Sequence, residues 1–303
     1  MYTYTAYGLN IHSSIKLPEL IKSNTDKLDV VIKFDKLNYS PVKDSSPYYN
    51  FEATTEGLYI YWKEIGTLLI SQGKEIILDT VIDAEESRLR LFILGAAIGT
   101  ILHQRGYIVL HASAVSLKNN GVVFTADKRR GKSTMAAALH KRGHSLIADD
   151  VVAIDFDKND RPIVYPAFPQ LKLWPDAVTY LGKNPQDLPQ LTTKLKKRDY
   201  LPKNNFVTKP LILKQIFVLS QGSEITVEPL SFQEIMLYLL HNTYVTRFGS
   251  SLLPSKDPSH FLKLTKLAKS TSVKRLVRPN SIELLSEVAQ KVENYLLSQS
   301  NNS

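Results

Sequence analysis

The sequence predicts a mixed α/β fold, α+β overall, with a mostly β N-terminal region, a strand–loop–helix core and C-terminal helices. Three observations lead to this fold class. Short runs that alternate apolar and polar residues fill residues 1–82. A Gly-Lys-Ser-Thr sequence at 131–134 lies between an apolar run and an alanine-rich stretch. Helical periodicity of apolar residues returns towards the end of the chain. We therefore expect two domains, residues 1–82 and residues 83–303.

Composition sets the class of protein. The chain has 303 residues, of which 43% are hydrophobic and 22% charged, so it can bury a sizeable core. It contains no cysteine, which excludes disulfides and thiolate metal sites and agrees with a reducing compartment. The N-terminus lacks the features of a signal peptide, and no apolar run approaches the ~20 residues that span a bilayer. We expect a cytoplasmic protein without a membrane partner.

The charge is positive but dispersed. The formal net charge is +9, from 38 Lys and Arg against 29 Asp and Glu. Its local concentrations are residues 128–132, 194–198 and 263–278. A nucleic-acid-binding protein would combine a basic stripe with a recognisable binding module, and no such motif is present. We therefore expect no specific nucleic acid partner, and we assign the excess to surface solvation or to an anionic ligand.

The N-terminal 80 residues predict strands. Alternating runs occur at 29–34, 58–62 and 67–70, separated by clusters of turn-forming residues. A helix is expected from Asp83, which serves as its N-cap, to about residue 104, with a broad apolar face. This helix would join the N-terminal region to the core.

The core begins with two strands, at 107–112 and 121–125. Asn120-Gly121 between them is a strong hairpin-turn signal. A helix at 132–142 and a strand at 145–149 follow. A compact strand–helix–strand unit places its strands parallel with a right-handed crossover. The carboxyl ends of the strand before the helix and the strand after it would then meet at one edge of the sheet.

The C-terminal half predicts fewer strands and more helices. Residues 183–209 are polar and rich in Pro and Lys, which predicts a mobile loop. Strands are expected at 211–220 and 225–229. Ser231 can cap a helix that continues to about residue 244, and a last amphipathic helix is expected at 281–297.

Residues 126–134 match most of a phosphate-binding loop, in which Gly, four residues and Gly-Lys-Ser/Thr lie between a strand and a helix. Ala126 replaces the first glycine, and basic residues fill positions often held by small ones. Backbone N–H groups of such a loop bind phosphate oxygens, Lys132 would reach the β- and γ-phosphates of ATP, and the Ser133 hydroxyl would ligate Mg²⁺. The alternative, a basic turn by chance, is weakened by the flanking strand and helix. The predicted nucleotide-binding residues are Ala126, Lys128, Arg129, Arg130, Gly131, Lys132, Ser133 and Thr134.

Asp149 and Asp150 are the predicted catalytic carboxylates. They end a strand at the sheet edge that also carries the loop. Adjacent residues of a strand point to opposite sides, so the pair can divide two roles. We assign Asp149 to accepting the proton of an acceptor hydroxyl and Asp150 to holding Mg²⁺, directly or through water, and the two roles can be exchanged. Taken alone, the pair could equally be an ordinary acidic turn.

Two further residues are candidates for the site. His111, near the end of the strand at 107–112, could contact phosphates or orient an aspartate, although a histidine between Leu110 and Ala112 is more often a core residue. Arg198, in the polar loop, could close over a phosphate. A solvated charge run at 194–198 is the alternative for Arg198.

These residues resemble the catalytic core of the HPr kinase/phosphorylase family. The resemblance is carried by Leu-His-Ala-Ser-Ala-Val at 110–115, Gly-Lys-Ser-Thr at 131–134 and Arg-Gly-His-Ser-Leu-Ile-Ala-Asp-Asp-Val at 142–151. It covers only residues 107–155 and implies an HPr-kinase-like P-loop core. By position, the histidine upstream of the family's loop falls on His111, its loop lysine and metal-binding serine fall on Lys132 and Ser133, and its catalytic aspartate pair falls on Asp149 and Asp150. The family also implies a homo-oligomer.

The chain departs from that family in three ways. Its loop has fewer glycines, an Arg-Gly-Leu-Gly sequence is missing, and the N-terminal region differs. The whole chain instead resembles HPr-kinase-like proteins of lasso-peptide biosynthesis, at Tyr-Thr-Ala-Tyr-Gly-Leu (4–9), Leu-Pro-Glu-Leu (17–20), Pro-Gln-Leu-Lys-Leu-Trp-Pro (169–175) and Leu-Leu-His-Asn-Thr-Tyr (239–244). This resemblance implies an ATP- and Mg²⁺-dependent kinase that phosphorylates a serine, typically C-terminal, of a ribosomal precursor peptide.

Three other functions remain open from the sequence. A genuine HPr serine kinase/phosphorylase would share the same catalytic residues. The altered loop would also suit a regulator that binds nucleotide without catalysis. The positive charge would suit a nucleic-acid-binding ATPase, whose binding depends steeply on salt.

Overall fold

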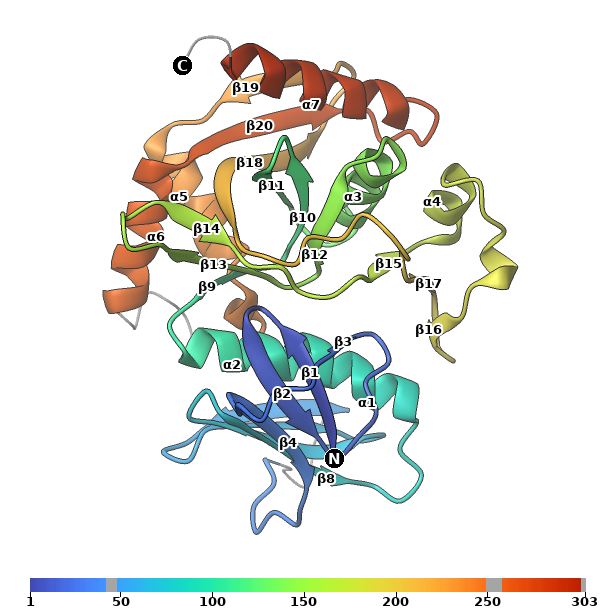
Figure 1. The fold of residues 1–303 in the computed structure, drawn as a ribbon, viewed down its shortest axis with the longest axis vertical. Helices are drawn as coiled ribbons and strands as arrows, with labels where there is room; N and C mark the ends of the chain where they lie inside the picture. Colours follow the sequence, from blue (N-terminus) through green and yellow to red (C-terminus); the bar gives the residue numbers. More distant parts are fainter. Residues whose placement is uncertain (42–47, 249–257, 301–303) are drawn as a thin grey trace.

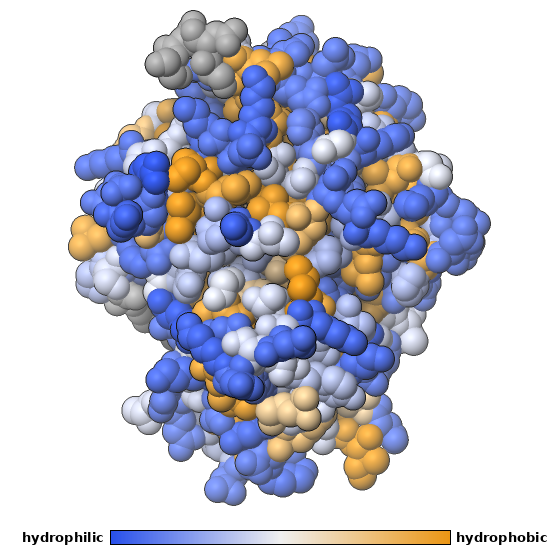
Figure 2. Space-filling view, viewed as in Figure 1, coloured by the Kyte–Doolittle hydropathy of each residue, from blue (hydrophilic) through white to orange (hydrophobic). Residues whose placement is uncertain are grey.

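The computed structural model describes residues 1–41, 48–248 and 258–300. It is a mixed α/β structure, as predicted, with two large sheets on either side of a long broken helix (Figure 1). Hydrophilic side chains cover much of the face seen in Figure 2, and apolar side chains gather in smaller patches between them. Within the described residues, no helix combines the length and apolarity needed to cross a membrane.

The first 80 residues form an eight-stranded sheet, which confirms the strand-rich N-terminal region. The predicted strands at 29–34, 58–62 and 67–70 all occur. The strand order is β3-β1-β2-β4-β8-β7-β6-β5, and the sheet mixes parallel and antiparallel pairs. The strands are β1 (Tyr2–Ala6), β2 (Leu9–Ser13), β3 (Ile21–Lys22), β4 (Val30–Phe34), β5 (Tyr49–Ala53), β6 (Leu58–Trp62), β7 (Gly66–Ser71) and β8 (Glu75–Thr80).

The helix that follows is present but begins later than predicted. It consists of α1 (Glu86–Phe92), a π-helical turn (Ile93–Ala97) and α2 (Ile98–Gln104). Its N-cap is Glu85, and no side chain caps it, so the assignment of the cap to Asp83 was wrong. The cause is a separate turn in which Ala84 N–H donates to the Val81 carbonyl and delays the first helical turn.

The second sheet has nine strands and carries the loop. Its order is β12-β10-β11-β18-β14-β13-β9, with β20 beside β18 and β19 beside β20. The strands are β9 (Ile108–Leu110), β10 (Ala112–Leu117), β11 (Asn120–Thr125), β12 (Ser145–Asp149), β13 (Val152–Phe156), β14 (Pro162–Val164), β18 (Leu211–Gln221), β19 (Thr226–Pro229) and β20 (Ser272–Arg278).

The hairpin before the loop is shifted from its predicted place. The strand β10 was not predicted, and the turn is formed by Lys118 and Asn119, with φ of 49° and 60°, instead of Asn120-Gly121. Asn120 already pairs with Leu117 in the ladder. Asn-Gly was a misleading signal because the two left-handed residues of the turn are Lys118 and Asn119, whereas Asn120 and Gly121 already belong to the strand.

The strand–helix–strand geometry is as predicted, with one strand inserted. After β11 come α3 (Lys132–Lys141) and β12, and β10 lies between β11 and β12, antiparallel to both. The strands β11 and β12 are therefore parallel to each other. Ser113 of β10 pairs with Phe124 on one side and Asp149 on the other. The carboxyl ends of β11 and β12 thus meet at one edge.

The predicted mobile loop at 183–209 was wrong, because part of it forms a small sheet. This sheet has the order β15-β17-β16, and a short helix, α4, precedes the hairpin of β16 and β17. The polar pattern hid these strands because Leu191 and Thr192 are the only buried residues of β16, and no residue of β17 is buried. The elements are β15 (Leu171–Leu173), α4 (Pro175–Tyr180), β16 (Gln190–Thr192) and β17 (Leu195–Tyr200).

At the C-terminal end, the capping box at Ser231 is present, with Glu234 as its partner. The helix α6 and the strand β20 were not predicted, and α7 begins at Leu285 instead of 281. One hydrophobic core joins the N-terminal sheet to α1, α2 and the second sheet, and another surrounds α3 and α7. The division into domains at residue 82 stays a prediction. The helices are α5 (Phe232–His241), the 3-10 turn Tyr244–Phe248, α6 (Pro258–Ser270) and α7 (Leu285–Ser300).

Candidate functional site

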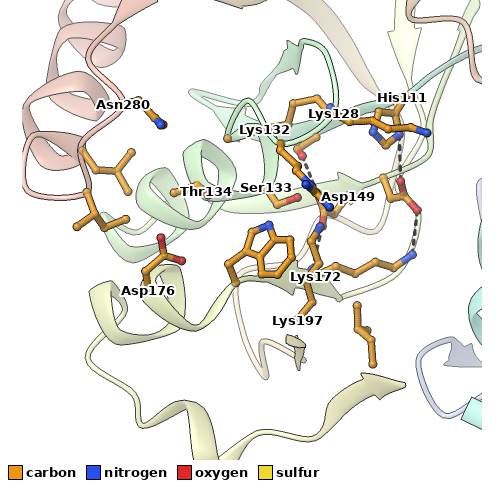
Figure 3. Close-up of a pocket in the computed structure, with 18 of the residues that line it drawn as sticks. His111, Lys128, Lys132, Ser133, Thr134, Asp149, Lys172, Asp176, Lys197 and Asn280 are labelled. Atoms are coloured by element: carbon orange, nitrogen blue, oxygen red, sulfur yellow. Dashed lines mark hydrogen bonds and ion pairs between the residues drawn. The ribbon is translucent and has the colours of Figure 1, made fainter. Parts of the chain in front are cut away.

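A cavity of about 680 Å³ lies where β12 ends and α3 begins (Figure 3). Most of the residues predicted for the site line it. The exceptions are Ala126, Arg130 and Arg198. The predicted residues in its wall are His111, Lys128, Arg129, Gly131, Lys132, Ser133, Thr134, Asp149 and Asp150.

The loop at 126–131 closes on the lysine of α3. Lys132 Nζ donates to the carbonyls of Ala126, at 2.9 Å, and of Asp127, at 3.1 Å. Ala126 is buried, with its side chain in the core around α3 and α7, so only its carbonyl faces the lysine. Its side chain is therefore a core residue, and a nucleotide contact through its backbone stays a prediction. Arg129 and Gly131 have positive φ, of 64° and 86°, and these backbone turns curve the loop.

Arg278 supports this loop from β20. It is 6% exposed, and burial lowers the pKa of its guanidinium. Its Nη2 donates to the Arg130 carbonyl at 3.0 Å and its Nη1 to the Pro279 carbonyl at 3.0 Å. A Cβ at Gly131 would overlap this guanidinium, which explains why a glycine lies there. Sequence reasoning treated Arg278 as part of a basic run; its position two residues after the apolar Leu276 was the only signal of burial.

Arg130 differs from its neighbours in the loop. Its side chain donates to Gln221 Oε1 at 2.9 Å, on the outer side of the loop. It lines a separate cavity of about 260 Å³ and not the main one. The prediction that Arg130 contacts the nucleotide is thus not supported by its position, whereas Lys128 and Arg129 line both cavities.

Asp149 is buried and held on both sides. Its Oδ1 accepts from Ser113 Oγ at 2.5 Å and its Oδ2 from the Lys172 N–H at 2.9 Å. The residue is 5% exposed. The carboxylate therefore has a single orientation, with one oxygen towards β10 and the other towards β15.

Asp150 lies at the rim of the cavity with a strained backbone. Its φ is 72°, in the left-handed region that aspartate tolerates better than most residues. Its Oδ1 is 3.0 Å from His111 Nδ1, and its Oδ2 is 3.0 Å from Lys172 Nζ. The side chain is 21% exposed. Asp150 is therefore the more accessible of the two carboxylates, and His111 orients it.

Lys172 was not singled out by the sequence analysis. Its side chain is 7% exposed, yet it contacts both carboxylates, one through its backbone and one through its ammonium. The available signal in the sequence was a single lysine between the apolar residues Leu171 and Leu173. The structure shows that all three residues are buried, and lysine is seldom buried unless it is paired.

Behind the carboxylates, the connecting helix makes room for an aromatic ring. Tyr244 is 1% exposed and lies against Gly95 and Gly99, where a Cβ at Gly99 would come within 2.6 Å of the ring. The His111 N–H donates to the Asn242 carbonyl at 2.8 Å, which fixes the histidine backbone beside Tyr244. The π-helical turn is thus close to the site, as such turns often are.

Arg198 is not part of the cavity wall. It lies in β17, where it pairs with Leu173 of β15. Its neighbour Lys197 lines the cavity instead, since successive residues of a strand point to opposite sides. The structure therefore gives the expected phosphate contact of Arg198 no support, and Lys197 is the cation that this strand presents to the cavity.

The residues of the cavity fit Mg²⁺ bound together with a nucleotide. Across the described ranges, no group of three or more His, Asp or Glu side chains has metal-binding geometry. Mg²⁺ at phosphates needs only one or two protein oxygens, because waters and phosphate oxygens complete its octahedron. The Ser133 hydroxyl and the carboxylates of Asp149 and Asp150 supply such oxygens at one cavity.

Comparisons with known proteins give little beyond this geometry. No model of a known protein family matches the chain, and no curated protein matches it. Among solved structures it is similar to the Hpr(Ser) kinase/phosphatase from Coxiella burnetii, with 15% sequence identity and a TM-score of 0.34. The alignment covers 63% of this chain and 98% of that one. Similarity at this level carries no argument about function, which is therefore argued from the cavity.

Proposed function

We propose that the chain is an ATP- and Mg²⁺-dependent kinase that transfers phosphate to a serine hydroxyl. The observation that carries the proposal is the meeting of two sets of residues at one cavity. Lys132 and Ser133 lie at the N-terminus of α3, and Asp149 and Asp150 lie at the end of β12. A helix N-terminus with a lysine favours phosphate, and adjacent carboxylates can accept a proton.

The nucleotide would lie against the loop. In this proposal Lys132 exchanges its bonds to the loop carbonyls for the β- and γ-phosphates of ATP. Lys128 and Arg129 add charge-assisted hydrogen bonds where a typical loop offers glycines. Mg²⁺, held by Ser133 and by Asp149 through water, would neutralise charge that develops on the phosphates.

Asp150 is the better candidate for the base, which exchanges the two roles first assigned. It is 21% exposed at its side chain, whereas Asp149 is 5% exposed. The serine Oγ would form a bond to the γ-phosphorus while the bond from that phosphorus to the bridging oxygen of ADP breaks. The hydroxyl proton would pass to the Asp150 carboxylate, which His111 and Lys172 hold in place.

The substrate class rests on the resemblance in sequence alone. It implies a C-terminal serine of a lasso-peptide precursor, and we propose this peptide as the acceptor. Leu91, Leu191 and Leu195 also line the cavity and give it apolar side chains to receive a peptide, and Lys197 could pair with an acidic group. The cytoplasmic location, the homo-oligomer and the lack of a specific nucleic acid partner remain predictions.

The test is direct phosphate transfer. The protein is incubated with ATP, Mg²⁺ and three precursor peptides: with a C-terminal serine, with that serine amidated, and with the serine moved inside the chain. We expect mass spectrometry to detect one added phosphate on the first peptide, and none with Asp150→Asn. A parallel reaction contains HPr in place of the peptides. Transfer to HPr alone would identify an HPr kinase instead, and nucleotide binding without transfer or hydrolysis would identify a regulator.

A further inference from the structure

The direction of the nucleotide follows from the order of residues around the cavity. Lys132, Asp149 and Asp150 line the same cavity. In the proposed function Lys132 holds the γ-phosphate and the carboxylates act on the acceptor hydroxyl, so the γ-phosphate would lie at the carboxylate end of the cavity. In Figure 3, Asp176 and Asn280 lie on the opposite side of Ser133 and Thr134 from His111 and Asp149. A triphosphate that extends from the carboxylates along the loop would therefore place its nucleoside towards Asp176 and Asn280.

Apolar and aromatic side chains also belong to the wall of this cavity. Trp174, Ile282 and Leu285 also line the cavity, together with Asp176 and Asn280. Trp174 adjoins Asp176 through Pro175, and Ile282 follows Asn280 by two residues. We propose that these five residues form a nucleobase site, with the base stacked on Trp174. This inference rests on the proposed function, since it requires a nucleotide at the loop.

The chemistry of the five residues suits a base that carries an amino group. An aromatic ring and two aliphatic side chains provide the flat apolar contact that a base needs. The Asp176 carboxylate only accepts hydrogen bonds, so it selects a base that presents N–H groups, such as the amino group of adenine. The Asn280 amide both donates and accepts, which matches adjacent groups on a base edge.

The site is also well supported. Trp174 is the N-cap of α4, where Pro175 fixes the first helical residue and the Val178 N–H donates to the Trp174 carbonyl at 3.1 Å. Leu285 is 1% exposed and belongs to the core around α3 and α7. On the loop side, Arg278 ties the start of the 279–284 segment to the Arg130 carbonyl. The two halves of the site are thus anchored separately.

The space is sufficient for the whole ligand. A cavity of about 680 Å³ is within the range of small-molecule sites, so it has room for a nucleoside triphosphate from the base to the γ-phosphate. Lys197 Nζ lies 5.7 Å from the centroid of the Trp174 ring.

The experiment compares a ligand that has a base with one that lacks it. Dissociation constants for ATP and for inorganic tripolyphosphate are measured by calorimetry, both with Mg²⁺, on the wild type, Trp174→Ala and Trp174→Phe. We expect Trp174→Ala to weaken ATP binding by about tenfold, the loss of one stacked base, and to leave tripolyphosphate binding unchanged. Trp174→Phe keeps a ring and should retain most of the affinity for ATP.

Two results would overturn the inference. One is unchanged ATP binding in Trp174→Ala, which would leave the apolar end to an acceptor side chain. The other is equal weakening of ATP and tripolyphosphate, which would mean that Trp174 only supports the loop. If the wild type binds neither ligand, the proposed function itself fails, and the nucleobase site fails with it.

Discussion

Lys172 Nζ lies 3.0 Å from Asp150 Oδ2, and this ion pair links the small sheet of β15 to the end of β12. The same lysine donates its backbone N–H to Asp149. One residue therefore sets the distance between two carboxylates that are adjacent in sequence but point apart. Because the lysine side chain is 7% exposed, its charge acts on Asp150 with little screening by solvent.

Lys172→Met should lower the rate of phosphate transfer by at least about tenfold without raising the KM for ATP, because the phosphates contact the loop and not this lysine. Because Asp150 is 21% exposed and keeps His111 as a partner, removing the lysine ammonium should also cost only about 1–2 kcal/mol of the free energy of unfolding. Initial rates at varied ATP and urea unfolding would measure both effects.

The controls separate charge from packing. Lys172→Arg keeps the cation and should recover much of the transfer rate, whereas Lys158→Met, at an exposed turn, should change neither quantity. Transfer as slow in Lys172→Arg as in Lys172→Met would contradict a positioning role for the charge.

The two aspartates should respond differently to amidation. Asp150→Asn should reduce phosphate transfer by about 10²-fold or more, the usual contribution of a general base, while Asn keeps the left-handed backbone. Asp149→Asn should be milder, because an amide can accept from the Lys172 N–H and donate to Ser113 Oγ. Single-turnover rates would rank the two variants. A larger loss in Asp149→Asn would return the role of base to that residue.

The local part of the site could be predicted because it is encoded within one stretch of chain. The strand β11, the helix α3 and the strand β12 follow in sequence, and their crossover rule places Asp149 beside the loop. The inserted strand β10 did not disturb this result, since an antiparallel strand between β11 and β12 leaves them parallel.

Lys172 and Arg278 could not be predicted in the same way. They reach the site from β15 and β20, which tertiary pairing brings there, and the bonds of Arg278 to the loop span 148 residues of sequence. Basic side chains are usually exposed to solvent, so the sequence did not indicate that Lys172 and Arg278 are buried. Only the apolar neighbours of each residue in its strand signalled it.

The two arginines of the loop should have unequal effects on ATP. Arg129→Ser should weaken ATP binding by about tenfold, because it removes a guanidinium from the cavity. Arg130→Ser should change the affinity by less than about twofold, since that side chain bonds Gln221 outside the cavity. Calorimetric titration of both variants would compare them. Equal losses would mean that Arg130 turns inward when ATP binds.

Gly131→Ala should lower the free energy of unfolding by more than the strain of its backbone conformation alone. A side chain at φ of 86° costs about 1 kcal/mol, and the added Cβ also overlaps the Arg278 guanidinium. The matched control is Gly182→Ala, with φ of 76° and open space around the new Cβ. Urea unfolding should give a loss of about 1 kcal/mol for the control and at least about 3 kcal/mol for Gly131→Ala. Similar losses would show that the loop moves aside.

The contact between α7 and the end of α3 should make stability depend on pH. Glu293 accepts two hydrogen bonds from Arg142, at 2.8 and 2.7 Å, and another contact from His144 at 2.8 Å. The hydrogen bond from Arg142, and then that from His144, hold the pKa of Glu293 below its ordinary value of 4.5. Ionised Glu293 therefore stabilises the folded protein above about pH 4.5, and this stabilisation is lost as the pH falls through the lowered pKa of Glu293 in the folded state.

Glu293→Gln should accordingly reduce the free energy of unfolding by about 1 kcal/mol at pH 7, with the difference from wild type shrinking below pH 4.5. Glu287→Gln, an exposed position of α7, should stay within about 0.5 kcal/mol of wild type at each pH. Urea unfolding from pH 3 to pH 8 would measure the three proteins side by side. A constant difference for Glu293→Gln across that range would mean that the glutamate contributes packing and not charge. A contribution from its charge must disappear when the carboxylate is protonated, whereas a contribution from packing does not depend on pH.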